Sequence, residues 1–237
     1  HFDKEINNGF RYWKPSRSVI LRIYTIGLPA IISQALLTVM TYALNLILGA
    51  IPQVGQNAVT VYGLYYKIQQ LIIFAAFGVR DAITPIVSFN FGMRSRTRVQ
   101  QGIRWGLGYT AALMLLGCLG VELFAEPLAG LFSLSGTAHE MCVACMRTVS
   151  LGFLPAGLCI AFQGVFQALG RGVESLIISV FRQVLLVLPP VWALSQLVTG
   201  AENVSLVWWP LALGEAATLA VALVLYLVNG RKLVRSL

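Results

Sequence analysis

Charged side chains are scarce in this sequence. Asp, Glu, Lys and Arg make up only 11% of its 237 residues, whereas 57% are hydrophobic and the mean hydropathy is +0.77. A soluble domain carries roughly 25% charged residues. A chain with so few charges cannot hide its apolar surface in one water-soluble core. The composition therefore excludes an ordinary soluble protein and predicts a membrane protein.

Histidine and cysteine are also few. The two histidines are His1 and His139, and the sequence contains neither an H-E-x-x-H nor a G-x-S-x-G motif. Intramembrane metalloenzymes and serine hydrolases depend on such motifs. Cys142 and Cys145 form a C-x-x-C pair, but it lies on a predicted helix without a second pair of ligands, and we interpret both as packing residues. The sequence predicts no catalytic residues, no metal site and no enzyme.

Long apolar runs dominate what is present. A bilayer core about 30 Å thick needs about 20 apolar residues of helix, and open sheets cannot span lipid because their backbone groups would be unpaired. We therefore expect an all-α, polytopic membrane protein with six transmembrane helices. The expected spans are Val19–Ala50, Ala58–Phe89, Gly102–Phe124, Glu140–Leu169, Glu174–Val198 and Val204–Asn229.

The basic residues follow the ends of these runs. Most of the 17 Lys and Arg residues precede the first span, lie between the second and third or the fourth and fifth, or follow the sixth. The alternate loops, IPQVGQN, AEPLAGLFSLSGTAH and TGAEN, contain neither residue. By the positive-inside rule, both ends of the chain are expected to be cytoplasmic. No nucleic-acid-binding module is visible, so the formal charge of +8 does not predict a nucleic-acid partner.

A few charges fall inside the predicted spans. Each charge at the membrane centre costs about 2.5–3.5 kcal/mol on insertion scales, so it needs a partner or an aqueous cavity. We expect Arg80, Arg147 and Arg182 to form a buried charge network, although such charges can also serve only to hold helices together. Away from the ends of the spans, the intramembrane charges are Lys67, Arg80, Asp81, Arg147, Arg182 and Glu215.

The second span shows a polar stripe. On a helical wheel at about 100° per residue, Lys67, Gln70 and Asp81 share a face with Phe74 and Ser88. We expect this face to point into the bundle. Depth counting places Glu215 of the sixth span at the level of Lys67, which suggests an ion pair between them. With Lys67, Gln70, Asp81 and Glu215, the candidates for a substrate or ion path include the amides Gln34, Asn45, Gln163 and Gln167, for which interhelical hydrogen bonding is the simpler interpretation.

Three stretches resemble the carboxyl-terminal half of the multidrug and toxic compound extrusion (MATE) exporters, and most of all the bacterial MepA-like branch. They are GLPAIISQALLTVMTYALNLILG, ITPIVSFNFGMRSRTRVQQGIRWG and FQGVFQALGRGVESLIISVFRQVLLVLPPVWAL. The resemblance implies one six-helix lobe of a twelve-helix transporter. It implies a cytoplasmic interlobe segment at residues 1–18, a transmembrane lobe at 19–229 and a basic cytoplasmic tail at 230–237. The amino-terminal lobe would then be a missing partner belonging to the same protein.

The same resemblance implies a function. Such exporters are secondary active antiporters that expel drug-like, often cationic small molecules across the plasma membrane in exchange for Na⁺ or H⁺, with no other cofactor. Some members carry acids in the first and fourth spans of this lobe, where this sequence has Gln34 and, near the outer end, Glu140. We therefore expect coupling to depend on the missing lobe rather than on Asp81 or Glu215.

Two alternatives remain open. A flippase of the same superfamily, moving lipid-linked sugars, would use the intramembrane basic residues to hold pyrophosphate. A half-size membrane scaffold would need no second lobe.

Overall fold

The computed structural model describes residues 16–132 and 134–237, and most of the expected interlobe segment at 1–18 lies outside them. In the described residues every regular element is helical, and the prediction of an all-α membrane protein is confirmed. The helices are α1 (Arg17–Gly49), α2 (Gly55–Gly92), α3 (Arg96–Leu131), α4 (Thr137–Ser150), α5 (Phe153–Ala168), α6 (Gly172–Val180), the π-helical turn η2 (Phe181–Leu185), α7 (Leu188–Ser195), the 3₁₀ segment η3 (Ala201–Val207), α8 (Trp209–Leu225), the π-helical turn η4 (Tyr226–Gly230) and α9 (Arg231–Arg235).

In the part of the chain that the structure covers, these elements supply five apolar segments of membrane-spanning length, and a sixth if a bent pair of helices counts as one span. Helices α1, α2 and α3 are each long and apolar enough to cross alone, as are the composite segments Gly172–Ser195 and Ala201–Arg235. Helices α4 and α5 are long and apolar enough only as a pair, and this pair is bent by 47°. The bend lies at Leu151–Gly152, just before Pro155, and a proline in the first turn of α5 is accommodated without a break.

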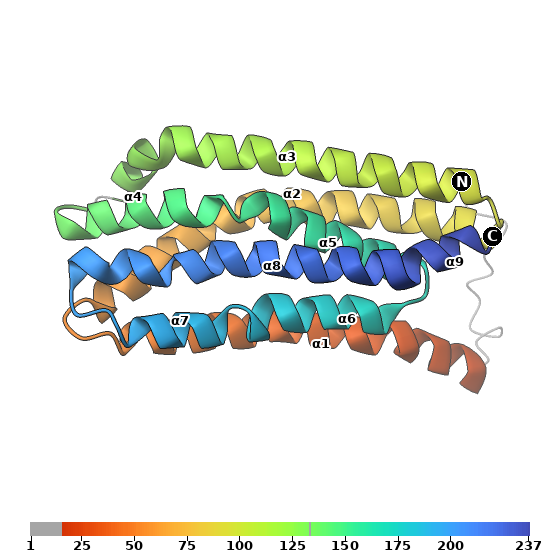
Figure 1. Ribbon diagram of the computed structural model, residues 1–237, viewed down its shortest axis with the longest axis horizontal. Helices are drawn as coiled ribbons and strands as arrows, with labels where there is room; N and C mark the ends of the chain where they lie inside the picture. The colour runs from red at the N-terminus through yellow and green to blue at the C-terminus, as the bar shows by residue number, and fades with distance from the viewer. Residues whose placement is uncertain (1–15, 133) are drawn as a thin grey trace, which may run out of the picture.

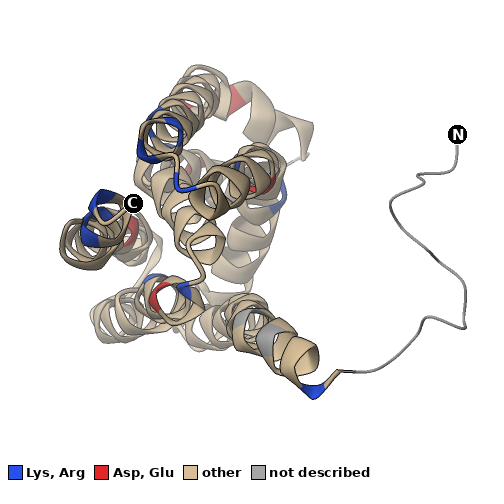
Figure 2. Cartoon of the chain, turned by 90° about the vertical axis from the view of Figure 1, so that its right-hand side faces the viewer, with Lys and Arg blue, Asp and Glu red and all other residues tan. Residues whose placement is uncertain are grey.

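The helices divide into two groups (Figure 1). Helix α2 packs against α3 and α5, whereas α1 packs against α6, and α8 lies between the groups. The start of α1, the α2–α3 turn, the α5–α6 turn and α9 all lie at the same end of the bundle. Figure 2 looks onto this end and shows Lys and Arg at several of its helix ends. The fold therefore gathers the basic loops at one end, as the alternation of basic and uncharged loops predicts.

The main core lies toward the opposite end. Its largest fully buried side chains include Trp208, Tyr65 and Phe153, and the rings of Tyr65 and Phe153 stack at 6.4 Å. Many large apolar side chains face outward instead, such as Leu71 and Leu123, which are 76% and 74% exposed. In a bilayer, helix association depends on close packing and polar contacts rather than on the exclusion of water. The outward apolar side chains are accordingly suited to lipid.

Candidate functional site

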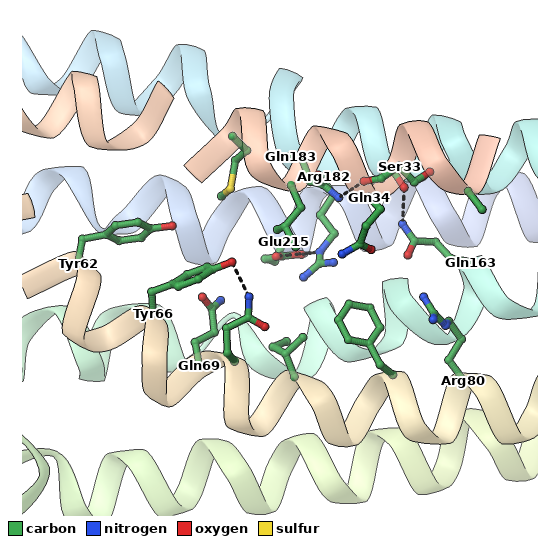
Figure 3. A pocket seen from close by; sticks show the side chains of 17 residues that line it. Ser33, Gln34, Tyr62, Tyr66, Gln69, Arg80, Gln163, Arg182, Gln183 and Glu215 are labelled. Atoms are coloured by element: carbon green, nitrogen blue, oxygen red, sulfur yellow. Dashed lines mark hydrogen bonds and ion pairs between the residues drawn. The ribbon is translucent and has the colours of Figure 1, made fainter. Parts of the chain in front are cut away.

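A polar cavity of about 80 Å³ lies between the two groups of helices (Figure 3). A volume of this size holds several water molecules, since one needs about 10–15 Å³ on this measure. Six elements contribute to it: α1, α2, α5, α6, η2 and α8. The lining residues are Ala30, Ser33, Gln34, Leu37, Met40, Tyr62, Tyr66, Gln69, Gln70, Ile73, Phe77, Arg80, Gln163, Ser179, Arg182, Gln183 and Glu215.

Helical spacing explains how α2 lines one wall of the cavity. On α2 the lining residues recur every three or four positions, from Tyr62 and Tyr66 through Gln69 to Phe77 and Arg80. Residues at this spacing share one face of a helix. The α2 wall of the cavity is therefore a stripe of mainly aromatic, amide and basic side chains.

A buried ion pair closes the side of the cavity formed by η2 and α8. The Nε of Arg182 donates to both carboxylate oxygens of Glu215, at 2.9 and 2.7 Å. The side chains are only 10% and 13% exposed. Because this attraction acts away from bulk water, it is much stronger than that of an exposed pair.

The backbone around this pair is shaped to bring the charges together. Arg182 lies in the π-helical turn η2, a type of distortion often found at functional sites. Gly214 precedes Glu215 and lies against Leu186 and Val187, which connect η2 to α7. A Cβ at position 214 would stand 2.8 Å from the carbonyl oxygen of Leu186, so only glycine permits this approach.

Arg80 reaches the cavity from α2. Its guanidinium pairs with Asp81 at 2.8 Å and lies 4.8 Å from the ring centroid of Phe77, in a cation–π geometry. The Arg80 side chain is 24% exposed, whereas that of Asp81 is 65% exposed and does not line the cavity. Of these two candidates, only Arg80 belongs to the cavity wall.

The predicted amides occupy different places. Gln34 and Gln70 line the cavity, and Gln70 donates to the hydroxyl of Tyr66. Gln163 also lines it and donates to Ser179 of α6 at 2.8 Å. Outside the cavity, Gln167 donates to Ser175 at 3.1 Å, which joins α5 to α6. Asn45 is half-buried on α1 and does not contribute to the cavity.

The pairing of Lys67 with Glu215 was wrong. Glu215 pairs with Arg182, and Lys67 is exposed on the outer face of α2 together with Phe74, Asp81 and Ser88. The observed cavity stripe lies one residue earlier along α2 than the predicted one, so the two differ by about 100° around the helix. A wheel shows which residues share a face, but not the direction of that face.

Arg147 is also placed differently from the prediction of a buried network. Its side chain is 52% exposed and pairs with the 68% exposed Glu126 of α3 at 3.3 Å. Arg182 alone among the three predicted arginines is fully enclosed in the bundle, and Arg80 is partly so. The three arginines therefore do not form one network.

Sequence reasoning missed several residues of the cavity. Tyr62, Tyr66 and Gln69 on α2, Ser33 on α1 and Gln183 in η2 were not among the candidates. The α2 residues form a polar–aromatic stripe that a wheel centred one residue earlier would have contained. Gln183 directly follows Arg182, and its position depends on the π-helical turn, which leaves no signature in hydropathy.

Cys142 and Cys145 are buried on α4 as thiols. Among the residues described, no group of three His, Cys, Asp or Glu side chains lies close enough to hold a metal ion. Glu215, the one carboxylate among the described cavity residues, has both oxygens engaged by Arg182.

Comparison with known proteins connects this geometry to one family. A profile of the MatE family matches residues 29–192. The multidrug export protein MepA of Staphylococcus aureus is 24% identical over 219 residues, covering 92% of this chain and 47% of MepA. MepA of Staphylococcus saprophyticus is 24% identical over 227 residues, with 95% and 48% coverage. The chain thus spans about half the length of the curated relatives it matches.

Solved structures share the fold. A multidrug resistance MATE family transporter of the MOP superfamily in an outward-facing conformation superposes with a TM-score of 0.87 at 22% identity, covering 98% of this chain and 51% of that one. A MOP superfamily transporter from Pyrococcus furiosus gives the same TM-score and identity, with 96% and 50% coverage. Since the family profile covers more than half of its residues, this chain belongs to the MatE family of membrane transporters.

Proposed function

We propose that this chain is the carboxyl-terminal six-helix lobe of a secondary active antiporter. The complete protein exports drug-like, often cationic small molecules across the plasma membrane in exchange for Na⁺ or H⁺. The observation that carries this proposal is the polar and aromatic cavity inside a bundle of the MatE family. Ligand sites commonly combine apolar and aromatic walls with a few placed polar groups, and the named relatives are multidrug export proteins.

The topology proposed with it has both ends of the chain in the cytoplasm. The support is the gathering of Arg94, Arg171 and Arg231 at one end of the bundle, while the loops at the other end lack Lys and Arg. The partner in this proposal is an amino-terminal lobe of the same protein, which would complete the path on the open side of the cavity.

Efflux of a fluorescent dye from cells that express the complete protein tests the proposal. We expect Glu215→Gln to reduce efflux at least about fivefold, or about 1 kcal/mol, because it leaves Arg182 without its partner. Asp81→Asn should act in the same direction through Arg80. Glu126→Gln is the control, since this carboxylate is exposed and outside the cavity. Unchanged efflux at unchanged protein level would reduce Glu215 and Asp81 to structural roles.

The coupling ion requires a separate measurement. Dye transport by the purified protein in liposomes, under an imposed Na⁺ gradient or an imposed pH gradient, distinguishes the two ions. Transport that responds to neither gradient would contradict antiport.

The second candidate function is a flippase for lipid-linked sugars. Its support is the presence of two guanidinium groups, Arg80 and Arg182, in the cavity wall. Translocation of a fluorescent lipid-linked sugar by the same liposomes, without dye transport, would favour it. The third candidate, a half-size scaffold, requires that the natural gene encode these six spans alone, and the sequence upstream of residue 1 decides that.

A further inference from the structure

Arg182 uses only part of its hydrogen-bonding capacity on Glu215. A guanidinium carries five N–H donors in one plane, and both bonds to the carboxylate come from Nε. Within the part of the chain that the structure describes, neither Nη group has a hydrogen-bond partner. The Arg182 side chain is only 10% exposed, yet its Nη atoms are not among the buried atoms that lack a partner, so they remain accessible from the cavity. They are therefore available to a ligand or to exchangeable water.

The unoccupied donors face the cavity. Figure 3 shows the Arg182 side chain extending from η2 into the space between α1 and α2, with Gln34 beside its far end and Arg80 pointing into the same space from α2. Two parallel N–H bonds from one guanidinium edge match the two oxygens of a carboxylate. Glu215 fixes the other edge, so the group is already oriented before a ligand arrives.

The charge of the cavity wall also favours an anionic group as the partner of Arg182. Its charged members are Arg80, Arg182 and Glu215, which leaves one positive charge in excess. Glu215 already holds Arg182, and Arg80 is partly satisfied by Asp81. Among the described residues that line the cavity, no carboxylate is free to hold a cation, and Arg182 is the one guanidinium with both Nη groups open to a phosphate. The two open Nη groups of Arg182 match a single carboxylate.

We propose that the Nη groups of Arg182 bind the carboxylate of an amphiphilic small molecule, so that this cavity prefers a cationic ligand that also carries a carboxylate to a cation that lacks one. The inference rests on the proposed exporter function for the view that the ligand is a substrate. The binding site itself does not depend on transport.

Rhodamine B and its ethyl ester test the proposal, because they share one cationic ring system and differ only in the free carboxylate. Binding of each dye to the complete purified protein in detergent is followed by fluorescence polarisation. We expect the wild-type protein to bind rhodamine B about tenfold or more tightly than the ester, as for a charge-assisted pair of hydrogen bonds. Wild-type protein that binds the ester equally well, or binds neither dye, overturns the proposal.

Two variants assign the selectivity to Arg182. Arg182→Lys keeps a positive charge opposite Glu215 but lacks the planar pair of Nη donors, so rhodamine B binding should fall about tenfold while ester binding stays within about twofold. Arg182→Gln combined with Glu215→Gln removes both charges without leaving one unpaired, and it should also abolish the preference for rhodamine B. Arg147→Lys is the control and should bind both dyes as wild type does.

The outcomes are distinct. Equal losses for both dyes in Arg182→Lys, or no loss for either, contradict a carboxylate site at Arg182. Selective binding without dye transport in liposomes contradicts the exporter proposal and leaves the binding site standing. Transport of the ester alone, with no selective binding, contradicts the carboxylate site and leaves the exporter proposal standing.

Discussion

Removing both members of the Arg182–Glu215 pair should cost clearly less stability than the sum of the costs of removing each member alone. The pair is 10% and 13% exposed with Nε–oxygen distances of 2.7 and 2.9 Å. Two charges about 4 Å apart attract by about 4 kcal/mol at an effective dielectric constant near 20, and breaking a buried pair typically costs about 3–5 kcal/mol. We therefore expect Arg182→Gln and Glu215→Gln each to lose about 3 kcal/mol of unfolding free energy.

The double variant should lose less than the sum of the single variants, because neither buried charge is then left unpaired. We expect a coupling energy of at least about 2 kcal/mol in the double-mutant cycle. The unfolding free energy can be measured by circular dichroism as sodium dodecyl sulfate replaces a mild detergent in mixed micelles.

The exposed pair of Arg147 and Glu126 supplies the matched control. Its side chains are 52% and 68% exposed and its atoms lie 3.3 Å apart. Exposed pairs contribute about 1 kcal/mol or less, so the corresponding cycle should show a coupling below that value. If the Arg182–Glu215 cycle gave no larger coupling than this control, the argument from burial would be refuted.

Two further predictions test the packing and the topology. Gly214→Ala should destabilise the protein by about 1–3 kcal/mol, because its Cβ would stand 2.8 Å from the Leu186 carbonyl oxygen, whereas Gly108→Ala meets nothing within 4 Å and should be neutral or slightly stabilising in the same unfolding assay. A destabilised Gly108→Ala variant would contradict this comparison. In intact cells, a membrane-impermeant maleimide should label Glu202→Cys and spare Ser95→Cys until the membrane is permeabilised, and the opposite pattern would invert the proposed topology.

Much of the fold could be predicted because the bilayer restricts the choices. Apolar runs in lipid must be helical, so the expected span Ala58–Phe89 corresponds to α2 at Gly55–Gly92, and Val19–Ala50 corresponds to α1 at Arg17–Gly49. The side on which each basic loop lies follows from the even number of crossings between them. These features depend on composition along the chain, which the sequence states directly.

The site could be predicted only in part because it depends on contacts between distant helices. Counting residues along a helix estimates the depth of Glu215, but it cannot tell which neighbouring helix faces it. The partner of Glu215 proved to be Arg182, which lies in the π-helical turn η2. On α2, a shift of one residue in the assumed direction of the polar face was enough to select Lys67 and Asp81 instead of Tyr66 and Gln69.

The Arg182–Glu215 contact also determines how η2 and α8 align along their axes. Apolar helices in lipid can slide past one another at little cost, because lipid tails are as apolar as the side chains they replace. A slide of one helical turn, about 5.4 Å, would separate the guanidinium from the carboxylate and leave two unpaired charges inside the bilayer. Each would cost about 2.5–3.5 kcal/mol near the membrane centre. The pair thus sets a single register between two surfaces that would otherwise accept several.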